Sequence, residues 1–153
     1  MIAAVDVQYG NALAAAACVT FADWPATSAM QELTQLISDP APYVPGEFWR
    51  RELPGIVALL SALNVSPTII VIDGYVWLDE AGRPGLGAHL FEALNGNIPV
   101  IGVAKTPFRG SPHAQLVQRG SSGRPLYITA QGLPITEAAR AIRQMHGSHR
   151  IPT

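Results

Sequence analysis

Residues 67–74, PTIIVIDG, are the stretch that decides the fold of this chain. Four branched apolar residues follow one another at 69–72 without polar alternation, and a glycine closes the run soon after. Such a run is typical of a strand that is buried on both faces of a parallel sheet. Asp73 ends the strand, at the carboxyl edge where open α/β sheets bind their ligands. A carboxylate in this place either binds a cation or caps the following turn.

Length and composition indicate a compact globular protein. With 153 residues, 48% hydrophobic and 14% charged, the chain can bury a full core, and we expect a single domain over residues 1–153. No apolar run reaches the roughly 18 residues of a membrane span, and the first residues lack the basic region of a signal peptide. We therefore expect a cytoplasmic monomer with no membrane partner. The one cysteine, Cys18, permits no internal disulfide.

The net charge of −1 provides no general attraction for nucleic acid. A polynucleotide would therefore have to be bound through a local patch of cations or through a metal ion.

Residues 2–21 are predicted to form a β-hairpin. Residues up to Tyr9 alternate in polarity, Gly10-Asn11 is a turn pair, and an apolar run follows. Asp6 lies in the middle of the first strand, where an acidic residue is disfavoured unless it has a function. Residues 27–37 fit either a helix or a third strand of a meander.

A long amphipathic helix is predicted over residues 48–63, where apolar residues recur every three or four positions. Glu52 lies on the apolar stripe, where solvent does not explain it. A shorter helix over 86–94 follows the central strand, and residues 98–105 form a second buried strand. A strand, helix and strand in this order form a right-handed crossover with parallel strands, so Lys105 emerges beside the end of the central strand.

The chain after residue 105 is polar and cationic. Two short strands, 114–118 and 125–129, precede a helix that begins near Thr136, and residues 145–153 are predicted to be a frayed end. The arginines of this part form either an ordinary solvated surface or a patch that contacts phosphates. They are Arg109, Arg119 and Arg124.

Asp6, Glu52 and Asp73 lie on three separate elements, and each is placed where exposure to solvent does not explain it. Clustered carboxylates repel one another unless a cation lies between them. Oxygen ligands without paired Cys or His favour Mg²⁺, with Mn²⁺ as a substitute. A site of this kind suits phosphodiester hydrolysis. We predict that the three acids are catalytic residues and metal ligands, and that Lys105 is a catalytic residue that contacts the phosphate.

Four motifs of the chain resemble those of the endonuclease V family of ribonuclease H-like nucleases, in the same order and with similar spacing. They are VDVQY at 5–9, PYVPG at 42–46 with Arg51-Glu52, VIDG at 71–74 with Gly85 and His89, and the segment Ile98–Lys105. The resemblance covers residues 2–110 well and the remainder loosely.

The resemblance implies an α/β fold of the ribonuclease H-like class. In this fold an N-terminal antiparallel meander is followed by parallel strands, and helices cover both faces of a mixed sheet. The resemblance favours a strand over a helix at residues 27–37. It also implies that Asp6, Glu52 and Asp73 bind metal.

The family implies a nucleic-acid substrate. Its members cut DNA at the second phosphodiester on the 3′ side of deoxyinosine, and some prefer inosine in RNA. The segment that matches Tyr43, Pro45 and Gly46 acts in the family as a wedge between the strands. The further predicted nucleic-acid contacts are Arg83, His89 and Arg109. His89, which has apolar neighbours, is alternatively a structural histidine.

The chain also departs from the family pattern. Asp79 stands where the family has the histidine of a His-Pro-Arg stretch, and Arg83 substitutes for the arginine. Asp79 either pairs with Arg83 or helps to hold the metal. The Gly-His expected before the last helix is Gly132-Leu133, and the family's N-terminal helix and last histidine have no counterpart.

Two functions fit this combination. One is a metal-dependent endonuclease that acts on DNA or RNA containing inosine. The alternative is a catalytically weak or inactive nucleic-acid-binding protein that keeps the ribonuclease H-like fold.

Overall fold

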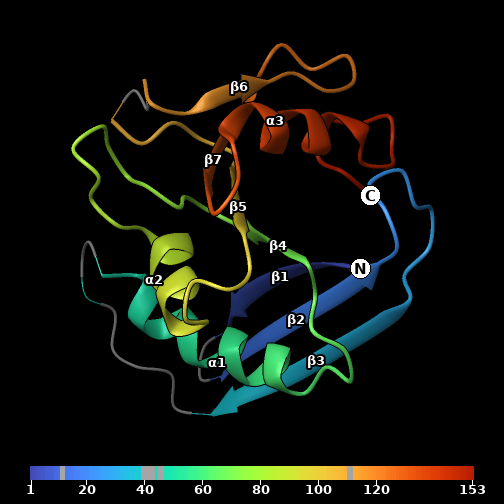
Figure 1. The fold of residues 1–153 in the computed structure, drawn as a ribbon, viewed down its shortest axis with the longest axis vertical. Helices are drawn as coiled ribbons and strands as arrows, with labels where there is room; N and C mark the ends of the chain where they lie inside the picture. Colours follow the sequence, from blue (N-terminus) through green and yellow to red (C-terminus); the bar gives the residue numbers. More distant parts are fainter. Residues whose placement is uncertain (11–12, 39–43, 45–46, 110–111) are drawn as a thin grey trace.

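A seven-stranded mixed sheet forms the centre of the molecule (Figure 1). The computed structural model describes residues 1–10, 13–38, 44, 47–109 and 112–153. The strands are β1 (Ile2–Tyr9), β2 (Leu13–Phe21), β3 (Gln31–Ser38), β4 (Ile69–Asp73), β5 (Val100–Ala104), β6 (Gln115–Val117) and β7 (Leu126–Gln131). They are arranged in the order β3-β2-β1-β4-β5-β7-β6.

The sheet combines an antiparallel N-terminal meander with a parallel centre. β2 pairs antiparallel with β1 and with β3, whereas β4 pairs parallel with both β1 and β5. β7 returns antiparallel to β5 and carries β6 at the outer edge. This arrangement confirms the predicted meander, the parallel crossover and the mixed sheet.

The central strand β4 is buried on both faces, as predicted. Ile70 and Ile72 pack in one hydrophobic core, and Val71 packs in a second core on the opposite side. Helices α1 (Trp49–Ser61) and α2 (Leu86–Ala93) contribute to the first core, and α3 (Ile135–Gln144) contributes to the second. Helices therefore cover both faces of the sheet.

Residues 31–38 form a strand, so the helical alternative for this part of the chain is wrong. β3 pairs with β2 along its whole length, and Leu33 lies opposite Cys18. Leu33 and Ile37 pack against the first core, while Leu36 on the other face is 68% exposed. Pairing with an existing strand decides the structure because a short segment with few apolar residues has no strong helical preference of its own.

The prediction that residues 145–153 fray is also wrong. Arg119 is only 7% exposed, and its guanidinium donates hydrogen bonds to five backbone carbonyls of this segment. The carbonyls belong to Met145, His146, Gly147, His149 and Arg150. Arg119 is thus neither a solvated surface residue nor part of a phosphate-binding patch.

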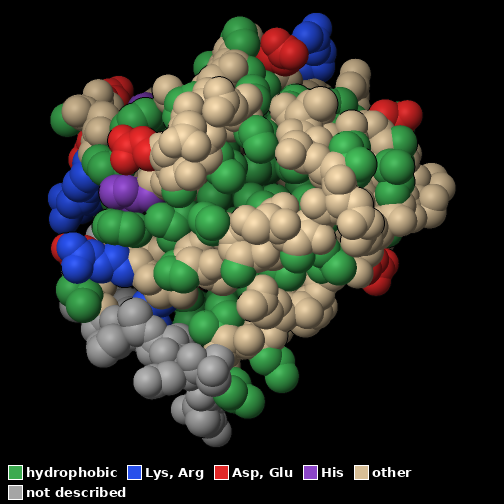
Figure 2. Space-filling model, turned by 60° about the horizontal axis from the view of Figure 1, so that its bottom comes forward, with side chains coloured by type: hydrophobic (Ala, Val, Ile, Leu, Met, Phe, Trp, Pro, Cys, Tyr) green, Lys and Arg blue, Asp and Glu red, His purple; other side chains and the backbone are tan. Residues whose placement is uncertain are grey.

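Lys and Arg side chains do not form a broad basic surface on the face that Figure 2 presents. This view brings forward the end of the molecule where α1 and β3 lie, and hydrophobic side chains cover its middle while basic side chains lie at its margin. Leu36 on β3 and Phe48 before α1 are among the exposed hydrophobic residues. Within the described residues, no helix is both long enough and apolar enough to cross a bilayer.

Gly102 of β5 provides a test of how tightly the centre of the sheet is packed. A Cβ added there would lie 2.6 Å from the Gly74 carbonyl oxygen and 2.8 Å from the Val76 nitrogen. Because both are backbone atoms, they cannot move aside as a side chain can. We expect Gly102→Ala to lower the free energy of unfolding by about 2 kcal/mol, measured by urea denaturation. The control Gly123→Ala, where nothing lies within 4 Å of the added Cβ, should change it by less than about 0.5 kcal/mol. Equal losses in both variants would contradict this packing.

Candidate active site

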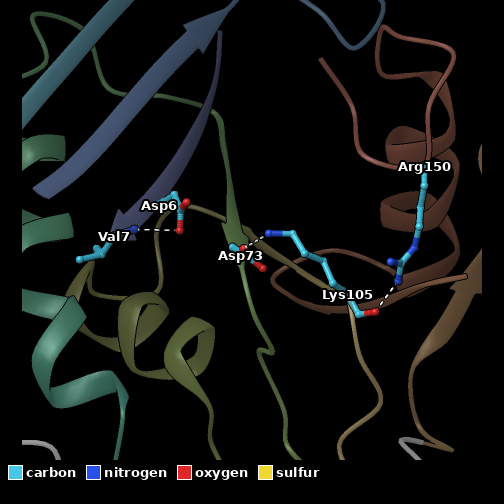
Figure 3. Close-up of polar contacts among 5 residues, drawn as sticks. All are labelled: Asp6, Val7, Asp73, Lys105 and Arg150. Atoms are coloured by element: carbon cyan, nitrogen blue, oxygen red, sulfur yellow. Dashed lines mark hydrogen bonds and ion pairs between the residues drawn. The ribbon is translucent and has the colours of Figure 1, made fainter. Parts of the chain in front are cut away.

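Asp73 and Lys105 meet at the carboxyl edge of the sheet, as predicted. Asp73 is the last residue of β4, and Lys105 directly follows β5. The Lys105 Nζ donates a hydrogen bond to the Asp73 Oδ2 and forms an ion pair with it (Figure 3). Because β4 and β5 are parallel, their final residues lie at the same edge and their side chains can reach each other.

Asp6 lies beside Asp73 on the neighbouring strand. The last registered pair of β1 and β4 is Val5 with Ile72, so Asp6 and Asp73 are each one residue further along. Adjacent strands are about 4.8 Å apart, so the two acids lie close together. The Asp6 Oδ1 accepts a hydrogen bond of 2.9 Å from the Val7 nitrogen (Figure 3). Asp6 and Asp73 are both exposed, so for these two acids the expectation of seclusion from solvent is wrong.

Glu52 comes from the first turn of α1 and is the buried acid of the group. It is 6% exposed, and it has no ion-pair partner among the described residues. Burial, as the largest cause, together with the negative charges of Asp6 and Asp73 raises the pKa of Glu52 to about 8, against a lowering by Arg51. The effect of both aspartates on Glu52 shows that the three carboxylates interact electrostatically.

The three acids offer the right donor atoms for a hard divalent cation. Among the described residues, no group of three or more His, Cys, Asp and Glu side chains forms a metal-binding cluster as it stands. Two features nevertheless fit a cation. Glu52 is a buried carboxylate whose ionised form is disfavoured, and the charges of Asp6 and Asp73 disfavour that ionised form further. A divalent cation would favour the ionised form of all three carboxylates. Lys105 is the cationic partner of Asp73.

A cavity of about 310 Å³ opens beside the acids. Its volume is at the lower end of the roughly 300–1,000 Å³ found for small-ligand pockets. Glu52 and Asp73 form its polar wall, Trp49 and Phe108 contribute aromatic rings, and Arg83 adds a positive charge. This cavity, which we call the site pocket, suits a flat apolar group with a charged attachment.

Asp79 pairs with Arg83, as one of the two sequence alternatives required. The Arg83 Nε lies 3.6 Å from the Asp79 Oδ2, and the Arg83 backbone nitrogen donates to the Asp79 Oδ1 at 3.0 Å. The guanidinium also lies over the ring of Phe108, 5.2 Å from its centroid. The ion pair therefore holds the Arg83 side chain beside Asp79, at the edge of the site pocket.

His89 packs in the way expected of a structural histidine. Its ring stacks on Trp49 with 3.7 Å between centroids, and burial lowers the pKa of His89.

Arg109 is exposed, and its guanidinium lies 5.7 Å from the Phe108 centroid. Tyr43, Pro45 and Gly46, the predicted wedge, lie outside the described residues.

Two residues near the acids were missed by sequence reasoning. Phe108 lines the site pocket, and the guanidiniums of Arg83 and Arg109 lie 5.2 and 5.7 Å from its ring centroid. The available signal was an aromatic residue next to Arg109 just after the second buried strand. Arg150 donates a hydrogen bond to the carbonyl of Lys105 (Figure 3). No local pattern marks Arg150, because its partner lies 45 residues away in sequence.

Comparison with known proteins identifies close relatives. A family model described as Endonuclease V matches residues 1–152. Endonuclease V of Streptomyces coelicolor is 39% identical over 149 residues, covering 95% of this chain and 59% of that relative. Endonuclease V of Rhodospirillum centenum is 33% identical over 143 residues, covering 92% of this chain and 58% of that relative. The chain thus spans less than two thirds of the length of these relatives.

Solved structures agree with the fold. Endonuclease V from Streptomyces avermitilis superposes with a TM-score of 0.78 at 28% identity, covering 99% of this chain and 74% of that one. Endonuclease V of Ciona intestinalis, in complex with a 24mer DNA containing an inosine followed by a ribo-adenosine, gives a TM-score of 0.80 at 19% identity, covering 99% and 79%. The ribonuclease H-like fold predicted from the motifs is confirmed.

The raised pKa of Glu52 leads to a stability prediction. The folded protein keeps the Glu52 proton up to about pH 8, whereas a solvated Glu carboxyl of the unfolded chain releases it near 4.5. Between these values the folded state binds more protons than the unfolded chain, so stability falls as the pH rises. Without divalent cations, we expect Glu52→Gln to be more stable than the parent by about 1–3 kcal/mol at a pH above 8, and not at about pH 5.

Chemical denaturation at the two pH values measures this difference. Glu80→Gln, which neutralises an exposed acid, is the control and should show no such dependence. A difference between Glu52→Gln and the parent that does not change with pH would contradict the raised pKa.

Proposed function

Because the chain belongs to the endonuclease V family, we propose that it is a Mg²⁺-dependent endonuclease that cuts a phosphodiester bond on the 3′ side of deoxyinosine or inosine in DNA or RNA. The observation that carries the proposal is the gathering of the motif acids and Lys105 at one edge of the sheet. The inosine-containing DNA bound by the Ciona intestinalis relative supports the choice of substrate.

Asp6, Glu52 and Asp73 would hold the divalent cation, with Mn²⁺ as a substitute for Mg²⁺. When bound, such a cation activates water and stabilises charge on the leaving oxygen. Lys105 would place its ammonium beside the scissile phosphate, where the oxygens gain negative charge during the reaction. The Asp73 carboxylate already orients that ammonium in the free protein.

The site pocket would receive the unstacked base. Nucleic-acid enzymes read a flipped base by stacking it between aromatic and apolar side chains, and the pocket has Trp49 and Phe108 in its wall. Tyr43, Pro45 and Gly46 would part the strands, since a ring on a proline-restricted backbone replaces a stacked base at small conformational cost. Arg83 and Arg109 would contact the nucleic acid around the pocket, and the exposure of Arg109 supports its role. The stacking of His89 on Trp49 favours the structural alternative for this histidine over a contact with nucleic acid.

A second candidate function is binding of nucleic acid without efficient cutting. Asp79 replaces the family's histidine and occupies Arg83 in an ion pair. The described residues also contain no metal-binding cluster as they stand. Cleavage measurements separate the two functions.

The central test is the cutting of an inosine-bearing duplex with Mg²⁺ and with a chelator. We expect cutting only with Mg²⁺, and Asp73→Asn should lose at least about 100-fold in rate while it keeps its fold, because the substitution removes a ligand charge and the partner of Lys105. Asp23→Asn, an exposed acid in a turn remote from the site, is the control and should cut normally. Full activity of Asp73→Asn would refute the site. A parent protein that binds the duplex and does not cut it would favour the second function.

A further test concerns Asp79. Its charge repels a phosphate a few ångströms away by a few kcal/mol at an effective dielectric constant of about 20. Asp79→His removes this repulsion and releases Arg83, so we expect cutting to rise several-fold with an unchanged dependence on Mg²⁺ concentration. Glu80→His changes the neighbouring exposed acid and leaves the ion pair intact, so it should have a smaller effect. A strong shift in the Mg²⁺ requirement of Asp79→His would instead make Asp79 a metal ligand.

A further inference from the structure

The backbone of Lys105 is held from the side opposite to its ion pair. The Arg150 Nη2 donates hydrogen bonds to the carbonyl of Lys105 and, at 2.8 Å, to the carbonyl of Pro125 (Figure 3). β5 ends at Ala104, and β7 begins at Leu126. Arg150 therefore joins the chain leaving β5 to the chain entering β7 at the edge where the acids lie.

Arg150 is itself held in place by the folding of residues 145–153, which we call the C-terminal strap. The Arg119 guanidinium donates to the carbonyls of His149 and Arg150, at 3.0 and 3.5 Å, and to three carbonyls earlier in the strap. The strap also packs closely on Gly120, where an added Cβ would lie 2.4 Å from the Ser148 oxygen. The Thr153 nitrogen donates to the His146 oxygen at 3.1 Å, which closes the strap on itself.

The cost of burying the Arg119 guanidinium indicates that the strap is an ordered part of the fold. A guanidinium that is 7% exposed has lost most of its hydration, and no carboxylate forms an ion pair with it among the described residues. Buried charge is costly unless hydrogen bonds compensate, and here the carbonyls of the strap supply them. Removing the strap would leave Arg119 without these acceptors, so the fold favours the closed strap.

The position of a lysine ammonium depends on the backbone that carries it. The Lys side chain has four rotatable bonds and loses rotamer entropy when it is fixed. In Figure 3 the Lys105 side chain extends toward Asp73, while its carbonyl points to Arg150. Fixing the carbonyl restricts the direction in which the side chain leaves the backbone, so the ammonium samples fewer positions.

We propose that Arg150 is a positioning residue for Lys105, and that the C-terminal strap couples Arg119 to the geometry of the site. This inference rests on the proposed function for its consequence in catalysis, since Lys105 would contact the phosphate. Its structural content is independent of that function. Arg150 acts through the backbone of Lys105, and it keeps the Lys105 ammonium at Asp73.

The chain offers a direct readout because Lys105 is its only lysine. Reductive methylation with ¹³C-formaldehyde labels the Lys105 amine and the N-terminal amine alone, and the latter serves as an internal reference. We expect Arg150→Met to raise the methylation rate of Lys105 about fivefold relative to that reference. We also expect it to move the NMR signal of labelled Lys105 toward that of free lysine. Arg140→Met, which removes an exposed arginine of α3, is the matched control and should leave both unchanged.

The same variants separate this inference from the proposed function. If the parent cuts inosine-containing substrate, Arg150→Met should lower kcat about tenfold with little change in KM, because the ammonium is misplaced while the binding surface remains. If the parent does not cut, the methylation rate and the NMR signal still test the position of Lys105. A folded Arg150→Met protein with an unchanged Lys105 rate and signal would overturn the proposal. Should Arg150→Met fail to fold, Arg150→Gln keeps a polar side chain whose amide ends two bonds short of the Nη2 position, so it also loses the contact with the Lys105 carbonyl. An unchanged Lys105 rate and signal in that variant would overturn the proposal equally.

Discussion

Parallel pairing of β4 with both of its neighbours is the constraint on which the site depends. Parallel strands end at a common edge, so the acid on β1, the acid on β4 and the lysine after β5 come together without any long loop to carry them. An antiparallel neighbour would have placed its corresponding residue at the other end of the sheet. The burial of β4 on both faces keeps this register, because a slip by one residue would exchange the side chains of the two cores.

The site contains three carboxylates and one lysine, so a cation could compensate the excess of acidic groups. Glu52 is buried next to two exposed aspartates, and its pKa is raised to about 8 for that reason. Lys105 offsets the charge of Asp73 only. With a net charge of −1 for the whole chain, no general field attracts a polyanion, so a polyanion would have to be bound through local groups. A divalent cation among the three carboxylates would at once relieve their repulsion and supply the missing positive charge.

Arg119 illustrates how a polar residue can organise a terminal segment. Its guanidinium satisfies carbonyls that follow the end of α3, where backbone acceptors have no helical partner. This interaction brings Arg150 to the edge of the sheet that carries the acids. Hydrogen bonds therefore connect Arg119, the C-terminal strap and the carbonyl of Lys105 at the edge of the sheet where the acids lie.

Local sequence determined those helices and strands whose hydrophobic pattern fits only one kind of secondary structure. The apolar run of β4, the three- and four-residue spacing in α1 and the strand–helix–strand order were sufficient for the parallel centre, and hence for the meeting of Asp73 and Lys105. The Asp79–Arg83 pair was also accessible, because its partners are four residues apart. Residues 27–37 were ambiguous, since their apolar positions satisfy both periods, and only pairing with β2 decided between them. The burial of Arg119, the exposure of Asp6 and Asp73, the stacking of His89 on Trp49 and the contact of Arg150 with Lys105 were decided by the tertiary structure alone. Each depends on groups that are distant in sequence, and no local periodicity records which distant group will approach.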